Sequence, residues 1–88
     1  MAFTGSIEEQ FAQAQQAVKA LAADPGNEAK LQLYALYKQA TSGDVAGKRP
    51  GFTDMVGRAK YDAWSKLKGL TSDAAMQQYI GVVQGLAG

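Results

Sequence analysis

The chain of 88 residues is long enough for one hydrophobic core, and we expect a single domain over residues 1–88. Hydrophobic residues make up 47% and charged residues 19%, a balance typical of globular proteins and too apolar for a disordered chain. The net charge of +1 does not favour a nucleic-acid partner, and the lack of Cys and His excludes disulfides and removes the usual zinc ligands.

The first predicted element is a helix over residues 6–23. Ser6 and Glu9 have the spacing of a capping box, in which each side chain satisfies a free backbone N–H. Apolar residues then recur at steps of three and four along one helical face: Ile7, Phe11, Ala14, Val18 and Leu21. We expect Phe11, Val18 and Leu21 to lie in the core. The turn at residues 24–26, Asp-Pro-Gly, ends this helix.

The second helix is predicted over residues 28–41, with Asn27 as its N-cap. Two neighbouring stripes run along it, one of Leu33, Leu36, Tyr37 and Ala40 and the other of Leu31, Tyr34 and Lys38. Residues 45–52 are predicted to form a loop, because Arg49 precedes a proline and is therefore disfavoured in a helix.

The third helix is predicted over residues 54–68, with Thr53 or Asp54 as its cap and Gly69 just beyond its end. One side of this helix carries Val56, Lys60, Ala63, Trp64 and Leu67. We expect Trp64 to be a core residue.

The fourth helix is predicted over residues 73–86, capped by Thr71 or Ser72. Its apolar stripe consists of Met76, Tyr79, Ile80, Val83 and Leu86. Gly81 and Gly85 lie within it, and each should weaken the helix by about 0.5–1 kcal/mol relative to Ala. Four amphipathic helices without a strand pattern indicate an all-α bundle, with its longest connection between the second and third helices.

The charges are distributed unevenly along the chain. Residues 30–68 carry eight basic against three acidic side chains, a net of +5, while both flanking segments are net negative. Such a region suits a compact anion, although a solvated lysine face would have the same composition. Tyr34, Tyr37 and Lys38 share one helical patch, where two rings and an ammonium suit a base and a phosphate. The alternative is a pair of half-buried tyrosines with their hydroxyls at the rim.

Catalysis has little support in the sequence. Asp44, Asp54 and Asp62 fall at loop, cap and helix-surface positions, and no Ser or Thr has a His to activate it. We therefore expect no catalytic residue, no enzymatic activity and no metal site.

A series of ordered motifs covers the second half of the chain. They are Tyr-x-x-Tyr-Lys-Gln-Ala-Thr-x-Gly-Asp at residues 34–44, Arg-Pro-Gly at 49–51, Gly-Arg-Ala-Lys-Tyr-Asp-Ala-Trp at 57–64, Leu-Lys-Gly at 67–69 and Ala-Met-x-x-Tyr-Ile at 75–80. Together with the first helix and the Asp-Pro turn, they closely resemble the acyl-CoA-binding protein family over essentially the whole chain. The resemblance implies an up-down-down-up four-helix bundle that binds, buffers and carries medium- and long-chain acyl-CoA esters, one per protein, with no cofactor.

The resemblance also implies roles for residues that contact the CoA part of the ligand. Tyr37 matches the ring that stacks on adenine. Tyr34, Lys38 and Lys60 match the group that holds the 3′-phosphate, and Tyr79 matches a tyrosine that contacts the CoA moiety.

Three further positions match the family less specifically. Lys19 corresponds to a basic residue near the ligand, and Ala14 and Leu31 correspond to residues along the acyl path. The chain also departs from the family pattern at three positions, where other side chains are usual: Tyr61, Val56 and Gln15.

We expect a cytoplasmic monomer without integral membrane association. Small secreted domains usually need disulfides, the first residues lack a signal-peptide pattern, and no apolar run is long enough to span a bilayer. The expected partners are acyl-CoA esters, with transient contacts to enzymes that use them. Two alternatives are a helical protein-interaction module without a ligand and an enzyme such as a thioesterase or isomerase, which the lack of His and Cys disfavours.

Overall fold

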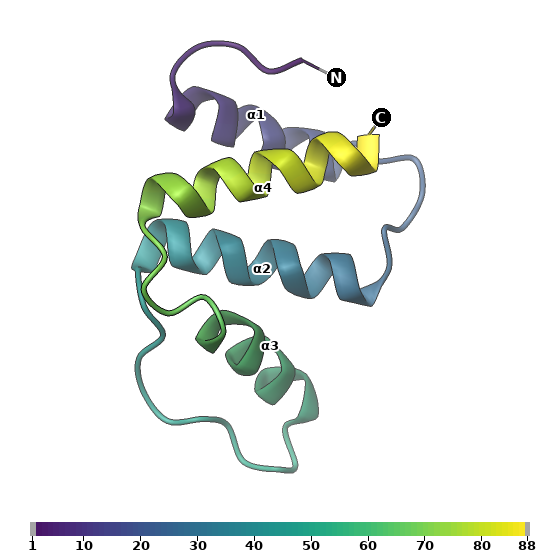
Figure 1. Cartoon of the computed structure of the whole chain (residues 1–88). Helices are drawn as coiled ribbons and strands as arrows, with labels where there is room; N and C mark the ends of the chain where they lie inside the picture. Colours follow the sequence, from purple (N-terminus) through teal and green to yellow (C-terminus); the bar gives the residue numbers. More distant parts are fainter. Residues whose placement is uncertain (1, 88) are drawn as a thin grey trace.

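The computed structural model describes residues 2–87, which form four helices and no strand. The helices are α1 (Ile7–Lys19), α2 (Asn27–Ser42), α3 (Met55–Ser65) and α4 (Ser72–Ala87). They lie in the order α1, α4, α2, α3 across the molecule, and α1 and α4 run opposite to α2 and α3 (Figure 1). The Cα atoms occupy a flat layer of 40 × 29 × 14 Å. The predicted all-α, up-down-down-up bundle is confirmed.

The buried core lies between α1, α2 and α4. Its apolar members are Phe11, Ala14, Leu33, Leu36, Met76, Tyr79, Ile80 and Val83. The predicted core residue Phe11 is buried, while Val18 and Leu21 are only half-buried at the edge. In contrast, α3 contributes no buried residue, because it packs against α2 alone and its outer face has no neighbour.

The first helix begins as predicted and ends early. Ser6 and Glu9 form the expected capping box, with each side chain accepting a hydrogen bond from the other residue's backbone N–H. The helix stops at Lys19 instead of reaching residue 23. The N–H groups of Ala20 and Leu21 turn back to carbonyls three residues earlier, which tightens the last turn and closes the helix.

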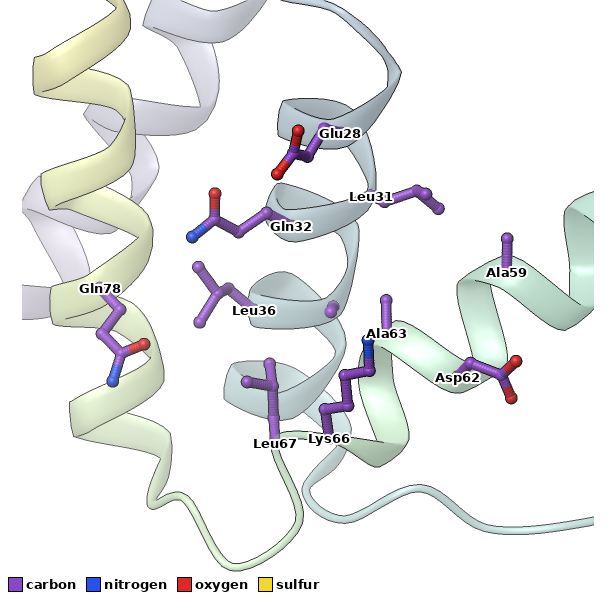
Figure 2. Close-up of a pocket in the computed structure, with 11 residues that line it drawn as sticks. Glu28, Leu31, Gln32, Leu36, Ala59, Asp62, Ala63, Lys66, Leu67 and Gln78 are labelled. Atoms are coloured by element: carbon purple, nitrogen blue, oxygen red, sulfur yellow. The ribbon is translucent and has the colours of Figure 1, made fainter.

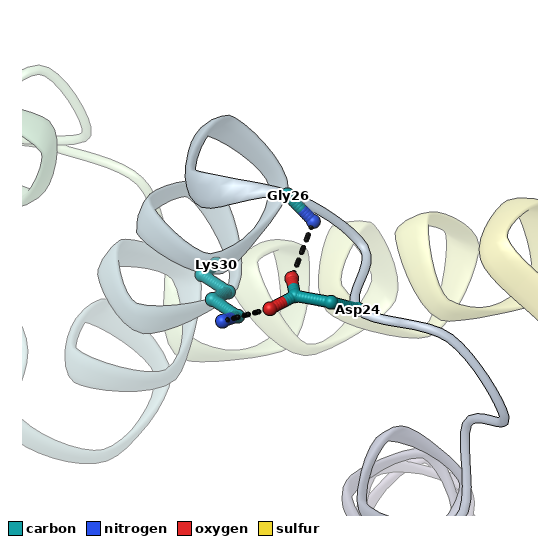
Figure 3. Close-up of polar contacts among 3 residues, drawn as sticks. All are labelled: Asp24, Gly26 and Lys30. Carbon is teal, nitrogen blue, oxygen red and sulfur yellow. Dashed lines mark hydrogen bonds and ion pairs between the residues drawn. The ribbon is translucent and has the colours of Figure 1, made fainter.

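The start of α2 corrects the predicted cap. Gly26, not Asn27, occupies the N-cap position, and no side chain caps the helix there. Gly26 has φ = 94°, a backbone conformation that favours glycine. The Asp24 carboxylate supports this turn, because it accepts hydrogen bonds from the Gly26 N–H at 2.8 Å and the Lys30 ammonium at 2.7 Å (Figure 3).

The third helix is shorter than predicted. Asp54 is its N-cap and accepts a hydrogen bond from the Gly57 N–H at 2.9 Å, but the helix ends at Ser65, three residues early. Trp64 is half-buried, which corrects its assignment to the core. Its indole N–H donates to the carbonyl of Gly43 at 2.8 Å, so the ring needs a polar neighbour.

A polar network joins the end of α2 to the two connections that flank α3, and we call these five residues the polar clasp: Gln39, Asp44, Trp64, Gly69 and Leu70. The buried Gln39 amide donates to Asp44 Oδ1 at 2.8 Å and to the Leu70 carbonyl at 2.9 Å, and it accepts from the Trp64 indole at 3.2 Å. Asp44 Oδ1 also accepts from the Gly69 N–H at 2.8 Å. The clasp therefore fixes α3 on α2 by hydrogen bonds.

Two further contacts hold the loops. Arg49 makes a two-pronged ion pair with Asp62, at 2.7 and 2.8 Å, which ties the long connection to α3. Thr71 Oγ1 accepts from the Ala74 N–H at 3.1 Å, so Thr71 is confirmed as the cap of α4. Within residues 2–87, no helix has both the length and the hydropathy needed to cross a bilayer.

Candidate functional site

Three tyrosines line one cavity of about 360 Å³, which we call the tyrosine cavity. Tyr34 and Tyr37 come from α2 and Tyr79 from α4, since residues three apart share a helical face and α4 packs beside α2. The Tyr37 ring is stacked against Phe11, with 6.1 Å between centroids and planes 29° apart. The Tyr37 side chain is nevertheless 40% exposed, so it offers a supported ring to a planar ligand.

Tyr79 forms the inner wall of this cavity and is only 6% exposed. The edge of one ring meets the face of the other between Tyr79 and Phe11, with 5.0 Å between centroids and planes 84° apart. Burial raises the pKa of Tyr79, and the nearby Tyr37 raises it further. The phenol is therefore neutral at ordinary pH and available as a hydrogen-bond donor.

A second cavity, of about 390 Å³, lies between α2 and the first turns of α3, and we call it the acyl groove for the ligand part that it suits. Its walls include the apolar side chains of Leu31, Met55, Val56 and Ala59. Tyr34 lines both this groove and the tyrosine cavity, so the two hollows adjoin along α2. An aromatic, hydroxyl-bearing compartment thus leads into an apolar one.

Two lysines stand on aromatic rings, one at the rim of the acyl groove and the other over Trp64, which lines neither cavity. The Lys60 ammonium, at the rim of the acyl groove, lies 5.2 Å from the centroid of the Tyr34 ring. The Lys38 ammonium lies 5.0 Å from the centroid of the Trp64 ring. Neither has a carboxylate partner within residues 2–87, where the ion pairs are Lys30–Asp24 and Arg49–Asp62. Their positive charge is therefore held in place and left available to an anion.

Lys30 is a site residue that the sequence reasoning missed. It lines both the tyrosine cavity and the acyl groove, and its ion pair with Asp24 anchors it at their junction (Figure 3). The hydrogen bond from Lys30, with a second from the Gly26 N–H, lowers the pKa of Asp24. The signal was present, because Lys30, Tyr34 and Lys38 follow one another at steps of four along one helical face.

The other expected site residues lie in different surroundings. Leu31 lines the acyl groove. Ala14 has no exposed surface and belongs to the core, and Lys19 is exposed at the end of α1. Neither Ala14 nor Lys19 lines the two cavities, so their roles stay predictions. No group of three or more carboxylates capable of holding a metal ion forms among the described residues.

Comparison with known proteins identifies the family to which the chain belongs. The model of the family described as acyl-CoA-binding protein matches residues 8–83. The chain belongs to the acyl-CoA-binding protein family. An acyl-CoA-binding protein homolog of Drosophila melanogaster is 49% identical over 80 residues, covering 91% of this chain and 93% of the relative. Acyl-CoA-binding protein of Brassica napus is 48% identical, covering 91% and 87% of the two chains.

The family also includes a segment of a larger enzyme and proteins of known structure. Enoyl-CoA delta isomerase 2 of Rattus norvegicus is 48% identical over 93% of this chain, which spans 21% of that protein. The crystal structure of Oryza sativa acyl-CoA-binding protein 2 superposes with a TM-score of 0.87 at 41% identity, covering 92% of this chain and 90% of that one. A Moniliophthora perniciosa relative gives 0.84 at 32% identity, covering 97% and 82%.

Proposed function

We propose that this protein binds medium- and long-chain acyl-CoA esters, one per chain, and buffers and carries them as a monomer in the cytoplasm without catalysing a reaction. The observation that carries the proposal is the junction of two unlike cavities along α2. One is lined by three tyrosines, the other is mainly apolar, and Lys60, which has no carboxylate partner among the described residues, stands at the rim of the second. An acyl-CoA has the matching parts: an adenine, phosphates and a hydrocarbon tail.

The head group matches the tyrosine side of the site. Tyr37 offers a supported ring for stacking on adenine, a contact that is worth about 1–3 kcal/mol for a base on an aromatic side chain. Lys60 stands on the Tyr34 ring, where its ammonium and the Tyr34 hydroxyl suit the 3′-phosphate. Lys38 follows Tyr34 by one helical turn on α2, and its ammonium lies over Trp64. Lys30 lies at the junction of the two cavities, where its ammonium, paired with Asp24, can also donate to a phosphate oxygen.

The tail matches the acyl groove. Leu31, Met55 and Ala59 line this groove directly beside Tyr34, so the chain enters apolar surroundings where the head group ends. Each methylene that leaves water contributes about 0.8 kcal/mol, or about fourfold in affinity. Binding should therefore need both parts of the ligand, and free fatty acid and free CoA should each bind more weakly than the ester.

Membership of the family favours binding over catalysis. The Drosophila and Brassica relatives are acyl-CoA-binding proteins of similar length, whereas this chain matches only a fifth of the rat isomerase. The protein-interaction module without a ligand is not favoured, because three tyrosines line one open cavity and Lys60 lines the adjoining groove.

The proposal is tested by calorimetric titration with palmitoyl-CoA below its micelle concentration, with free CoA and palmitate titrated in parallel. We expect one-to-one binding of the ester, weaker binding of CoA and no measurable binding of palmitate. Absence of heat and of thermal stabilisation with all three ligands would reject the proposal and favour the interaction module.

A further inference from the structure

A third hollow lies on the other side of α2 from the tyrosine cavity. This back cavity, of about 530 Å³, is bounded by α2, α3 and α4 (Figure 2). Gln32 and Leu36 line it, and successive residues 100° apart on a helix place them on the opposite side of α2 from Tyr34. Its inner wall is apolar, with Leu36, Ala63 and Leu67, while Glu28 and Gln78 stand at its polar rim.

The back cavity meets the acyl groove between α2 and α3. Leu31 and Ala59 line both hollows, and Figure 2 shows the Leu31 side chain directed toward α3. The α3 wall along this line consists of the methyl groups of Ala59 and Ala63. Figures 1 and 2 also show α3 diverging from α2 toward Met55, since the polar clasp holds only its other end. The two helices therefore bound one continuous crevice.

We propose that the back cavity receives the distal end of a long acyl chain, which crosses the bundle between Leu31 and Ala59. This inference rests on the proposed function, because the chain enters through the acyl groove. The Cα atoms extend over 14 Å along the shortest axis of the molecule. Carbon–carbon bonds of about 1.5 Å give an extended palmitoyl chain a length of roughly 19 Å, and an octanoyl chain roughly 9 Å. A palmitoyl chain is long enough to cross this layer, and an octanoyl chain is not.

The chemistry of the back cavity suits a hydrocarbon end. Without a ligand, the half-buried side chains of Leu31, Ala63 and Leu67 present apolar surface to water, and a hydrocarbon chain lying on them would remove that surface from solvent. The polar residues at the rim of the back cavity, Glu28 and Gln78, would stay in contact with water, while the terminal methyl group of the acyl chain would lie inside. The crossing makes Ala59 and Ala63 determinants of chain-length preference, because a larger side chain at either position would narrow the crevice.

Affinities of octanoyl-, dodecanoyl- and palmitoyl-CoA for three variants test this assignment. Ala63→Trp fills the back cavity from α3, and Gln32→Trp covers it from the exposed side of α2. Gln77→Trp is the matched control, since it adds the same ring at an exposed position of α4 that lines neither hollow. We expect the wild type and Gln77→Trp to bind palmitoyl-CoA at least about tenfold more tightly than dodecanoyl-CoA, given about fourfold per buried methylene.

In Ala63→Trp and Gln32→Trp, we expect this ratio to fall to about threefold or less, with octanoyl-CoA bound as in the wild type. An unchanged ratio in a folded variant that still binds octanoyl-CoA overturns the tail site and leaves the proposed function intact. Failure of the wild type to bind any ester overturns both.

A measurement on the unaltered protein does not depend on how the variants fold. Stearoyl-CoA with a nitroxide near its terminal methyl should broaden the backbone amide signals of Ala63 and Gln78 in NMR spectra. Octanoyl-CoA labelled in the same way should broaden Tyr34 and Met55 instead. Broadening by the stearoyl probe confined to Tyr34, Met55 and their neighbours would overturn the crossing.

Discussion

The two neighbours of α2 are held by different kinds of interaction. Toward α4, apolar side chains such as Leu33 and Ile80 are buried in a continuous core that also includes α1. Toward α3, the neighbouring helix buries no residue, and the polar clasp and the Arg49–Asp62 ion pair hold it in place. Stability should therefore depend mainly on the apolar layer, whereas the candidate site lies on both sides of α2, since Tyr79 of the core also lines the tyrosine cavity. The apolar layer resists unfolding, and the less buried helix leaves crevices open for a ligand.

The largest expected effect is a difference in stability when an apolar side chain is shortened on α4 or on α3. Ile80→Ala removes a buried side chain from α4 and should lower the free energy of unfolding by about 2–5 kcal/mol. Val56→Ala on α3 is the matched control and should change it by less than about 0.5 kcal/mol, because Val56 is 67% exposed. Urea denaturation followed by circular dichroism measures both values. Equal losses in the two variants would contradict the division drawn here.

The next effect is a loss of ligand affinity that leaves the stability of the protein unchanged. Lys60→Ala removes an ammonium that no carboxylate compensates among the described residues, and it should weaken palmitoyl-CoA binding by about 1.5–3 kcal/mol. The denaturation midpoint should stay close to that of the wild type. Lys48→Ala, at an exposed loop position, controls for the general loss of positive charge. The role of Lys60 is wrong if calorimetry gives equal affinities for the two variants.

An intermediate effect is expected for the polar clasp. Gln39→Leu replaces the side chain by an apolar one of similar size. The change removes the amide that forms hydrogen bonds with Asp44, Trp64 and the Leu70 carbonyl. Loss of these three hydrogen bonds, each worth about 0.5–1.5 kcal/mol net, should cost about 1–3 kcal/mol. Hydrogen exchange should also accelerate at α3 amides more than at α4 amides. Uniform acceleration across the four helices would indicate that α3 does not move separately from the core.

A smaller gain in stability is expected on α4. Gly81 lies inside the helix, and a Cβ added there would meet no atom within 4 Å. Gly81→Ala should therefore stabilise the protein by about 0.5–1 kcal/mol, because Ala restricts the unfolded chain and favours the helix. Thermal denaturation with and without ligand measures the gain. Destabilisation would show that close packing at this position depends on glycine.

The smallest effect is a dependence on acidity. Hydrogen bonds from the Gly69 N–H and from Gln39 lower the pKa of Asp44 below its ordinary value of 3.8. The charged form is therefore favoured in the folded state, so its contribution is complete well above pH 3.8 and is lost as the pH falls through that value. We expect the urea midpoint to fall between about pH 4 and pH 3 and to fall less in Asp44→Asn. Parallel curves for the two proteins would contradict this role.

The sequence predicted the helices and the shared face of Tyr34 and Tyr37 because both follow local spacing, while the head-group roles stay predictions. The capping box at Ser6 and the patch of Tyr34 and Tyr37 need only helical periodicity, and the family resemblance added the order of the helices. Two local details were wrong: Gly26 takes the cap position of α2, because the Asp24 carboxylate stabilises its turn, and Trp64 is only half-buried.

The remaining differences depend on tertiary contacts that periodicity does not report. An apolar stripe containing Val56 predicts a packed face, but only the arrangement of helices reveals that no helix covers it. The sequence does not distinguish Lys30 from the other basic residues, whereas the structure shows that it lines both cavities. The contact between the acyl groove and the back cavity likewise arises from the divergence of α3 from α2.

The order of the four helices also separates the chain ends from the crevice. α1 and α3 lie at opposite edges of the layer, and the start of α1 and the end of α4 both belong to the half without the crevice (Figure 1). A polypeptide joined ahead of Ile7 would therefore start at the edge of the layer opposite α3, whereas one joined after Ala87 would start near Pro25, which lines the tyrosine cavity. In such a fusion, the length of a flexible linker would determine the effective concentration of bound acyl-CoA at an attached catalytic domain. This geometry makes the bundle a portable module as well as an independent carrier.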